Sequence, residues 1–214
     1  MTFNMLYKEL RLTAHPTLYL FLFMGALVLV PGYPYGMVFF FGCLALFFTT
    51  QFARENHDVY YTAVLPLSKG DAVKGRCLLF GTFQLAQLAI SVPFALIRYH
   101  FFPGYNVVGI EADLAWYGAG LVIYAVFNYV FLTGYYKTVK KIGVPFLLAL
   151  APVLVLIVAV EILAHVPALA WIDSVEPADL LRQAPILAAG GAVWLLGWAV
   201  TIPAASSRFR RADL

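Results

Sequence analysis

Charged residues are scarce in this 214-residue chain, at 12% of the sequence. Soluble domains carry a charge on roughly a quarter of their residues, whereas this chain is 63% hydrophobic and has a mean hydropathy of +0.84. These values exclude an ordinary soluble domain and indicate an integral membrane protein. Cysteine is also scarce. Cys43 and Cys77 lie in or beside apolar runs, and two cysteines cannot build a disulfide framework or a cysteine metal site.

Motifs of catalysis are missing as well. The chain has no G-x-x-x-x-G-K-[ST], so it does not bind ATP through a P-loop. It has no H-E-x-x-H, no G-x-S-x-G and no pair of carboxylates within its apolar runs. The four histidines fall in loops or near the ends of apolar runs, where a solvated imidazole is the simpler interpretation: His15, His57, His100 and His165. The sequence therefore does not favour an intramembrane enzyme.

Long apolar runs are what the chain has in abundance. A helix needs about 20 apolar residues to cross a membrane, and six runs approach this length: residues 14–30, 36–52, 77–97, 114–135, 142–163 and 184–204. They do not alternate between apolar and polar residues, as the strands of a membrane β-barrel do. We predict an all-α integral membrane protein with six transmembrane helices in one domain, residues 1–214. No cleavage pattern follows the first run, which indicates an uncleaved span.

Basic residues are segregated between the predicted loops. Twelve of the fourteen lysines and arginines lie on the side that holds both termini, and only Arg98 and Arg182 lie on the other. By the positive-inside rule, both termini are cytoplasmic. Segments 98–113 and 164–183 are then extracytoplasmic, and the second is expected to hold a short surface helix. The net charge of +3 reflects this topology and does not indicate nucleic-acid binding.

Residues 1–13 form a separate element before the first span. Phe3, Leu6, Tyr7 and Leu10 recur at helical spacing, and polar residues occupy the rest of the turn. This pattern predicts an amphipathic elbow helix that lies in the headgroup layer. The alternative is a frayed cytosolic end of the first span.

The longest charged interruption is the loop 54–76, between the second and third spans. Residues 54–63 are predicted to continue the second helix past the membrane, with Arg54 and Asp58 on one face. Leu65-Pro66 ends that helix, and Ser68, three residues before Asp71, predicts a capping box that starts the next. The expected shape is a bent helix-turn-helix whose apolar contact points are Tyr60, Tyr61, Val64 and Leu65. Such a shape suits a groove in another protein.

These residues carry a family resemblance. The pattern Glu55-Asn56, then Leu65-Pro66-x-Ser68-Lys69, then Val73 and Arg76, resembles the membrane subunits of type-2 ATP-binding-cassette (ABC) exporters, in particular the small bacterial six-span permeases. The opening residues 7–12 (Y-K-E-L-R-L) resemble the N-terminal elbow of those subunits. The resemblance covers the chain up to the third span, and the last three spans agree in number and orientation.

The resemblance implies that 54–76 is a coupling loop gripped by a separate ABC ATPase subunit, which would bind ATP and Mg. This chain would hold no cofactor or metal of its own. The implied ATPase contacts are Glu55, Asn56, Asp58, Tyr60, Tyr61, Leu65, Pro66, Ser68 and Lys69. The resemblance also implies a homodimer, or a heterodimer with a similar permease, in the bacterial cytoplasmic membrane. The expected activity is export of a peptide, a lipid or a drug-like molecule.

A few polar residues fall within the predicted spans. Gln84, Gln87 and Ser91 share one face of the third helix, and Asn128 lies in the fourth. Since buried amides must find partners in lipid, this face is either a helix-packing seam or part of a substrate passage. Glu161, near the outer end of the fifth span, is either functional or paired locally with His165.

Small residues at 118–120 and 188–192 suit either internal helix packing or a dimer interface. Two other functions stay open. A secondary transporter with a three-plus-three inverted repeat would fit the alternation of short and long loops, with Glu161 as its ion site. A membrane scaffold without transport activity would make substitutions in the loop 54–76 silent.

Overall fold

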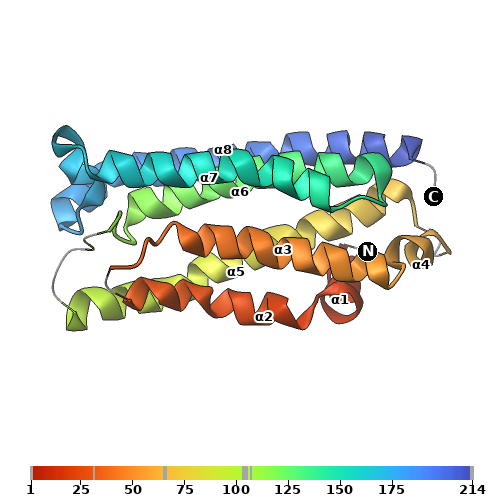
Figure 1. The fold of residues 1–214 in the computed structure, drawn as a ribbon, viewed down its shortest axis with the longest axis horizontal. Coiled ribbons are helices and arrows are strands. Elements are labelled where there is room, and N and C mark those ends of the chain that lie inside the picture. Colours follow the sequence, from red (N-terminus) through yellow and green to blue (C-terminus); the bar gives the residue numbers. More distant parts are fainter. Residues whose placement is uncertain (1, 31, 65–66, 103–105, 107, 213–214) are drawn as a thin grey trace.

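Figure 1 shows the fold in a computed structural model, which describes residues 2–30, 32–64, 67–102, 106 and 108–212. The regular structure of these residues is entirely helical. In chain order the elements are α1 (Thr2–Lys8), the π-helical turn η1 (Glu9–Thr13), α2 (Pro16–Leu22), the 3₁₀-helix η2 (Phe23–Leu29), α3 (Met37–Glu55), α4 (Asp58–Val64), α5 (Lys69–Phe101), α6 (Leu114–Thr138), α7 (Gly143–Ala164), the 3₁₀-helix η3 (Pro167–Asp173) and α8 (Pro177–Arg211).

Five of these helices, α3, α5, α6, α7 and α8, are long and apolar enough to cross a membrane. The bent pair Met5–Thr13 and Pro16–Leu29 raises the number of candidate spans to as many as six. Each candidate lies at one of the apolar runs found in the sequence. The expected surface helix in 164–183 is present as η3.

The chain bends by 102° between Met5–Thr13 and Pro16–Leu29. Pro16 takes the first helical position, where the N–H it lacks would have no partner, and the His15 ring accepts a hydrogen bond from the Thr17 N–H at 3.2 Å. The segment after the bend has only 7 α-helical and 7 3₁₀-helical residues. Because a 3₁₀-helix rises further per residue than an α-helix, this short segment still extends about 25 Å.

Helix α5 crosses the bundle diagonally, from the side of α8 to the side of η2 (Figure 1). Near its start, Gly81 lies against the Trp194 ring of α8. Further along, a Cβ on Gly25 of η2 would lie 2.9 Å from the Ser91 Cβ. α5 therefore joins the first span to the last, and it separates from α6 and α8 along its second half.

Helices α6, α7 and α8 form a second layer in which α6 and α8 touch through glycine (Figure 1). A Cβ on Gly190 would lie 2.2 Å from the Gly118 carbonyl oxygen, so the two backbones are in direct contact. The first small-residue set and part of the second thus serve internal packing. Gly191 faces open space.

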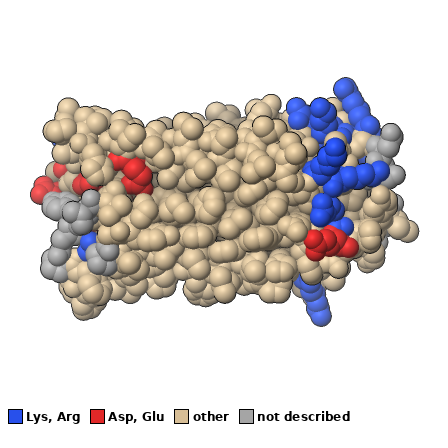
Figure 2. Space-filling model, in the orientation of Figure 1, with Lys and Arg blue, Asp and Glu red and all other residues tan. Residues whose placement is uncertain are grey.

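Charge divides the molecule along its long axis (Figure 2). We call the end that holds α1, α4 and the C-terminal part of α8 the basic end, since most lysines and arginines gather there. We call the opposite end the acidic end; it holds η3, and the contacts of Glu111, Asp113, Glu161 and Asp173 lie there. Between the two ends the visible surface is free of charge.

Candidate functional site

The predicted helix over 54–63 is broken in the structure. α3 ends at Glu55, and α4 begins at Asp58. The Asn56 amide donates to the Phe52 carbonyl at 3.0 Å, and His57 takes a left-handed φ of 53°, a conformation in which histidine is enriched among non-glycine residues. The predicted shared face of Arg54 and Asp58 was therefore wrong. The break turns Asp58 away from Arg54 and toward the N-terminal segment.

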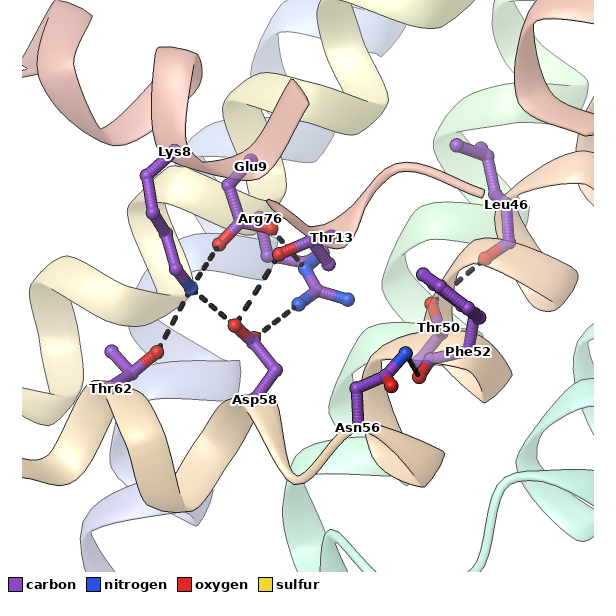
Figure 3. A network of polar contacts seen from close by, with 10 residues as sticks. All are labelled: Lys8, Glu9, Thr13, Leu46, Thr50, Phe52, Asn56, Asp58, Thr62 and Arg76. Atoms are coloured by element: carbon purple, nitrogen blue, oxygen red, sulfur yellow. Dashed lines mark hydrogen bonds and ion pairs between the residues drawn. The ribbon is translucent and has the colours of Figure 1, made fainter. Parts of the chain in front are cut away.

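Asp58 joins a buried network of ion pairs at the basic end (Figure 3). The Asp58 carboxylate lies 2.9 Å from Arg76 Nη2 and 2.5 Å from Lys8 Nζ. Glu9 lies 2.8 Å from Arg76 Nε and 3.1 Å from Lys8 Nζ. Lys8 also donates to Thr62 at 2.9 Å. These contacts connect α1 and η1 with α4 and α5.

The network excludes water from most of its charge. The side chains of Glu9 and Arg76 are 2% and 4% exposed, and those of Asp58 and Lys8 are 11% and 12% exposed. Two carboxylates face two cations, so the buried charges sum to zero. Since removing one partner of a buried ion pair leaves an uncompensated charge, these four side chains act as one unit. The network thus joins α4 to the N-terminal segment and to α5.

Sequence reasoning missed three members of this network. It placed Lys8 and Glu9 on the outer side of an amphipathic helix and treated Arg76 as the basic start of a span. One available signal was the spacing of Met5 and Glu9, which are four residues apart and so share a face. Met5 is buried, and Glu9 is buried beside it.

The outward face of α4 exposes apolar side chains. Tyr60, Tyr61 and Val64 are 49%, 54% and 85% exposed, and Glu55 and Asn56 before them are exposed too. A cleft of about 450 Å³ lies beside this face, lined by Arg54, Glu55, His57, Val59, Tyr60, Val139 and Lys140. Leu65 and Pro66 lie outside the described residues.

Ser68 and Lys69 connect the loop to the rest of the chain. The Ser68 hydroxyl accepts a hydrogen bond from the Asp71 N–H at 3.1 Å and caps α5, as predicted. Lys69 donates to the Ala212 carbonyl at 3.0 Å, and its ammonium lies 5.3 Å from the centre of the Phe209 ring. The loop therefore also touches the C-terminal end of α8.

The polar residues inside the bundle are brought together as a packing seam. Gln84 and Asn128 exchange two amide hydrogen bonds of 2.8 and 3.0 Å, and the Trp194 indole N–H donates to Gln84 at 3.0 Å. Gln87 donates to the Phe21 carbonyl at 3.0 Å and accepts from the Tyr124 hydroxyl. These bonds join α5 to α2, α6 and α8. Ser91 lies one turn further on and contacts the Tyr117 hydroxyl at 3.0 Å.

Glu161 lies apart from this seam, at the acidic end. Its two carboxylate oxygens accept hydrogen bonds from the backbone N–H groups of Gly36 at 3.1 Å and Ile110 at 3.0 Å. The predicted side-chain pairing with His165 does not form, because the His165 ring instead contacts the Glu161 backbone carbonyl at 2.8 Å. Glu161 thus fastens two connecting segments to α7.

Two further carboxylates, Glu111 and Asp113, are buried nearby, and Asp173 is partly buried. The Glu111 N–H donates to Asp173 at 2.7 Å, and the Glu111 carboxylate lies 3.6 Å from Arg98 Nη2. Asp113 caps α6 by accepting from the Trp116 N–H at 2.9 Å. Burial raises the pKa of Glu111 and of Asp173, and it raises the pKa of Asp113 to about 8. In the described part of the chain, no group of three or more histidine, cysteine, aspartate or glutamate side chains is arranged to hold a metal.

The comparisons with known proteins bear on the whole bundle. The family described as "ABC-2 family transporter protein" matches residues 4–199. This range includes the N-terminal segment, the loop 54–76 and nearly all the candidate spans. A search of curated proteins and a search of solved structures gave no match. Since the family match covers most of the chain, the protein belongs to the ABC-2 family of transporter membrane proteins, the permease components of ABC transporters.

Proposed function

We propose that the chain is the permease subunit of an ABC exporter, and that α4 is the helix through which a separate ATPase subunit drives it. The observation that supports this most directly is the two-sided character of α4. Its outer face carries Tyr60 and Tyr61, largely exposed, and its inner face carries Asp58 in the buried ion network. A partner seated on the outer face would thus act on α1, η1 and α5 together.

The chemistry of the outer face suits a protein groove. Aromatic side chains are enriched at the energetic centres of protein interfaces. The two tyrosines lie near exposed charged groups of both signs. The acidic group is that of Glu55, and the basic groups belong to the neighbouring turn at 137–141. A basic end with an aromatic centre and a polar rim fits a soluble partner better than it fits lipid.

The proposal includes the topology. The basic end would face the cytoplasm of a bacterial cell, with both termini on that side of the inner membrane, because lysine and arginine concentrate there (Figure 2). α1 and η1 would form the elbow in the headgroup layer. Transport would require a second permease copy or a similar chain, and ATP and Mg would bind to the ATPase subunits.

The test is co-purification in mild detergent with the cognate ATPase expressed alongside. Tyr60→Ala with Tyr61→Ala removes two exposed rings and leaves the ion network intact. We expect the ATPase to fall from stoichiometric recovery to background while the permease keeps its yield and its elution volume. Tyr129→Ala is the matched control, because Tyr129 is 43% exposed but belongs to α6. Full ATPase recovery with the α4 variant would refute α4 as the contact.

The secondary-transporter alternative relied on Glu161 as an ion site. Both Glu161 oxygens are occupied by backbone N–H groups in the structure, and this arrangement supports a structural role. Glu161→Gln then offers a discriminating measurement, since the alternative requires loss of ion-driven transport. An ATP-driven permease would keep its activity at a modest loss of stability.

A further inference from the structure

The separation of α5 from α6 and α8 leaves a long apolar groove toward the acidic end. Its volume is about 420 Å³, which is within the usual range for small-molecule sites. Leu85, Val92 and Leu96 of α5 line one wall, and Leu121, Leu180 and Leu187 of α6 and α8 line the other. From Leu85 to Tyr99 the groove follows α5 for roughly 20 Å, about two-thirds of the hydrocarbon thickness of a membrane.

The groove ends at polar atoms that have no partner. Asp113 is 2% exposed and lines the groove. Asp113 Oδ1 accepts the Trp116 N–H, whereas Asp113 Oδ2 has no well-aligned hydrogen bond from a described residue, although Gln183 and the Ala115 N–H lie near the carboxylate. The buried Tyr99 hydroxyl, which lines the same end, also lacks a partner among the described residues. Buried polar groups are nearly always hydrogen-bonded, so two such oxygens at the end of one groove are suited to accept hydrogen bonds from a bound molecule.

The charge around this end selects the kind of ligand. No lysine or arginine in the described part of the chain lies within ion-pair distance of Asp113. Asp173 adds negative potential there, and it is among the causes of the raised pKa of Asp113. Arg98, the cation in this region, contacts Glu111. An anionic head group would be repelled, whereas an ammonium would supply both the positive charge and hydrogen-bond donors for the two oxygens.

We propose that this groove binds a single-chain amphiphile with a protonated amine as its head group. The alkyl chain lies along α5, and the ammonium donates to Asp113 Oδ2 and to the Tyr99 hydroxyl. The binding does not depend on ATP coupling. The further statement, that such amphiphiles are the exported cargo, rests on the proposed function above.

The experiment uses the full chain, purified without any ATPase, and measures binding of dodecylamine by native mass spectrometry in mild detergent at pH 9, where Asp113, with a pKa of about 8, is ionised. Dodecanol and dodecyl sulfate share the chain length and differ in the head group. Asp113→Asn removes the charge and keeps the helix cap, because asparagine caps helices as well as aspartate does. We expect this variant to bind dodecylamine about tenfold more weakly, a change of roughly 1.4 kcal/mol, and to bind dodecanol as before.

The position of the site is tested separately. Ala89 is exposed and lines the groove, so Ala89→Phe should weaken binding of both dodecylamine and dodecanol about tenfold. Ala159→Phe is the matched control on α7, outside the groove. Equal binding by wild type and Asp113→Asn would overturn the ammonium contact, and equal binding by the two phenylalanine variants would overturn the groove. Full recovery of the ATPase with the α4 variant, with these binding results intact, would refute the proposed function alone.

Discussion

Carboxylates are buried or partly buried at both ends of this bundle, but their partners differ. At the basic end, Glu9 and Asp58 contact the side-chain cations of Lys8 and Arg76. At the acidic end, Asp113, Asp173 and Glu161 are held chiefly by backbone N–H groups. The first arrangement neutralises charge between separate segments. The second fixes the connecting segments in place, and it includes the ion pair of Glu111 with Arg98.

This difference has a consequence for what each end can do. A balanced set of side-chain ions holds three segments in one relative position. Burial raises the pKa values of the carboxylates at the acidic end, which accept hydrogen bonds from backbone N–H groups. A cation that approaches such a carboxylate would stabilise its charged form. On the proposals made above, the basic end would transmit the movement of the ATPase, and the acidic end would accept a cationic group.

The largest effect is expected from Arg76→Leu. This change leaves Glu9 and Asp58 with only Lys8, and an uncompensated buried charge typically costs about 3–5 kcal/mol. The free energy of unfolding, measured by denaturation in mixed micelles, should fall by about this amount. Arg210→Leu, at an exposed position near the end of α8, should change the free energy of unfolding by less than about 0.5 kcal/mol.

A double variant sharpens this measurement. Glu9→Leu together with Arg76→Leu removes one charge of each sign and leaves the pair of Lys8 and Asp58 in place. The double variant should therefore be more stable than Arg76→Leu alone, which gives a large coupling energy in a double-mutant cycle. Additive losses would show that the four charges do not act as a unit.

Changing aspartate to asparagine at each end should have effects of opposite sign. Asp58→Asn removes a paired charge and should lower the free energy of unfolding by about 2–3 kcal/mol. Asp113→Asn removes an unfavourable buried charge and should raise it by roughly 1–3 kcal/mol at pH 8. Both variants keep the shape of the side chain, so the sign reports the electrostatic environment.

The pH dependence follows from the pKa of Asp113, which rises from an ordinary value of 3.8 to about 8 on folding. Between these values the folded state binds a proton that the unfolded state has released, so stability falls as the pH rises. The stabilising protonation is complete below about pH 4 and is lost through pH 8. Asp113→Asn should flatten this slope. An unchanged slope would assign it to Glu111 and Asp173, whose pKa values are also raised.

Apolar runs predicted the helical fold because membrane crossing demands long stretches without charge. The start of α5 was also predictable, since a serine cap acts through atoms only three residues away. The break at Asn56 and His57 was not. The break allows Asp58 to contact Lys8 and Arg76, which are 50 and 18 positions away in the sequence. The local pattern of 54–63, by contrast, favours a continuous helix.

The same distinction separates the candidate site residues. The exposure of Tyr60 and Tyr61 could be expected from their place in a polar loop, whereas the burial of Glu9 could not. Glu9 is stable inside the bundle because Arg76 of the distant helix α5 contacts it in addition to its neighbour Lys8. Similarly, the sequence placed Gln84, Gln87 and Ser91 on one face but could not show that Asn128 and Trp194 would meet Gln84.

The smallest effect is expected between the two ends, in the uncharged seam. Gln84→Leu leaves the Asn128 amide and the Trp194 indole without their partner, yet hydrogen bonds between transmembrane helices contribute only about 0.6 kcal/mol on average. The variant should lose about 1 kcal/mol, and Gln84→Leu with Asn128→Leu should lose less than the sum of the two single changes, because both partners of one pair are then apolar. A substrate passage would contain independent polar groups, so strictly additive effects would favour a passage over a packing seam.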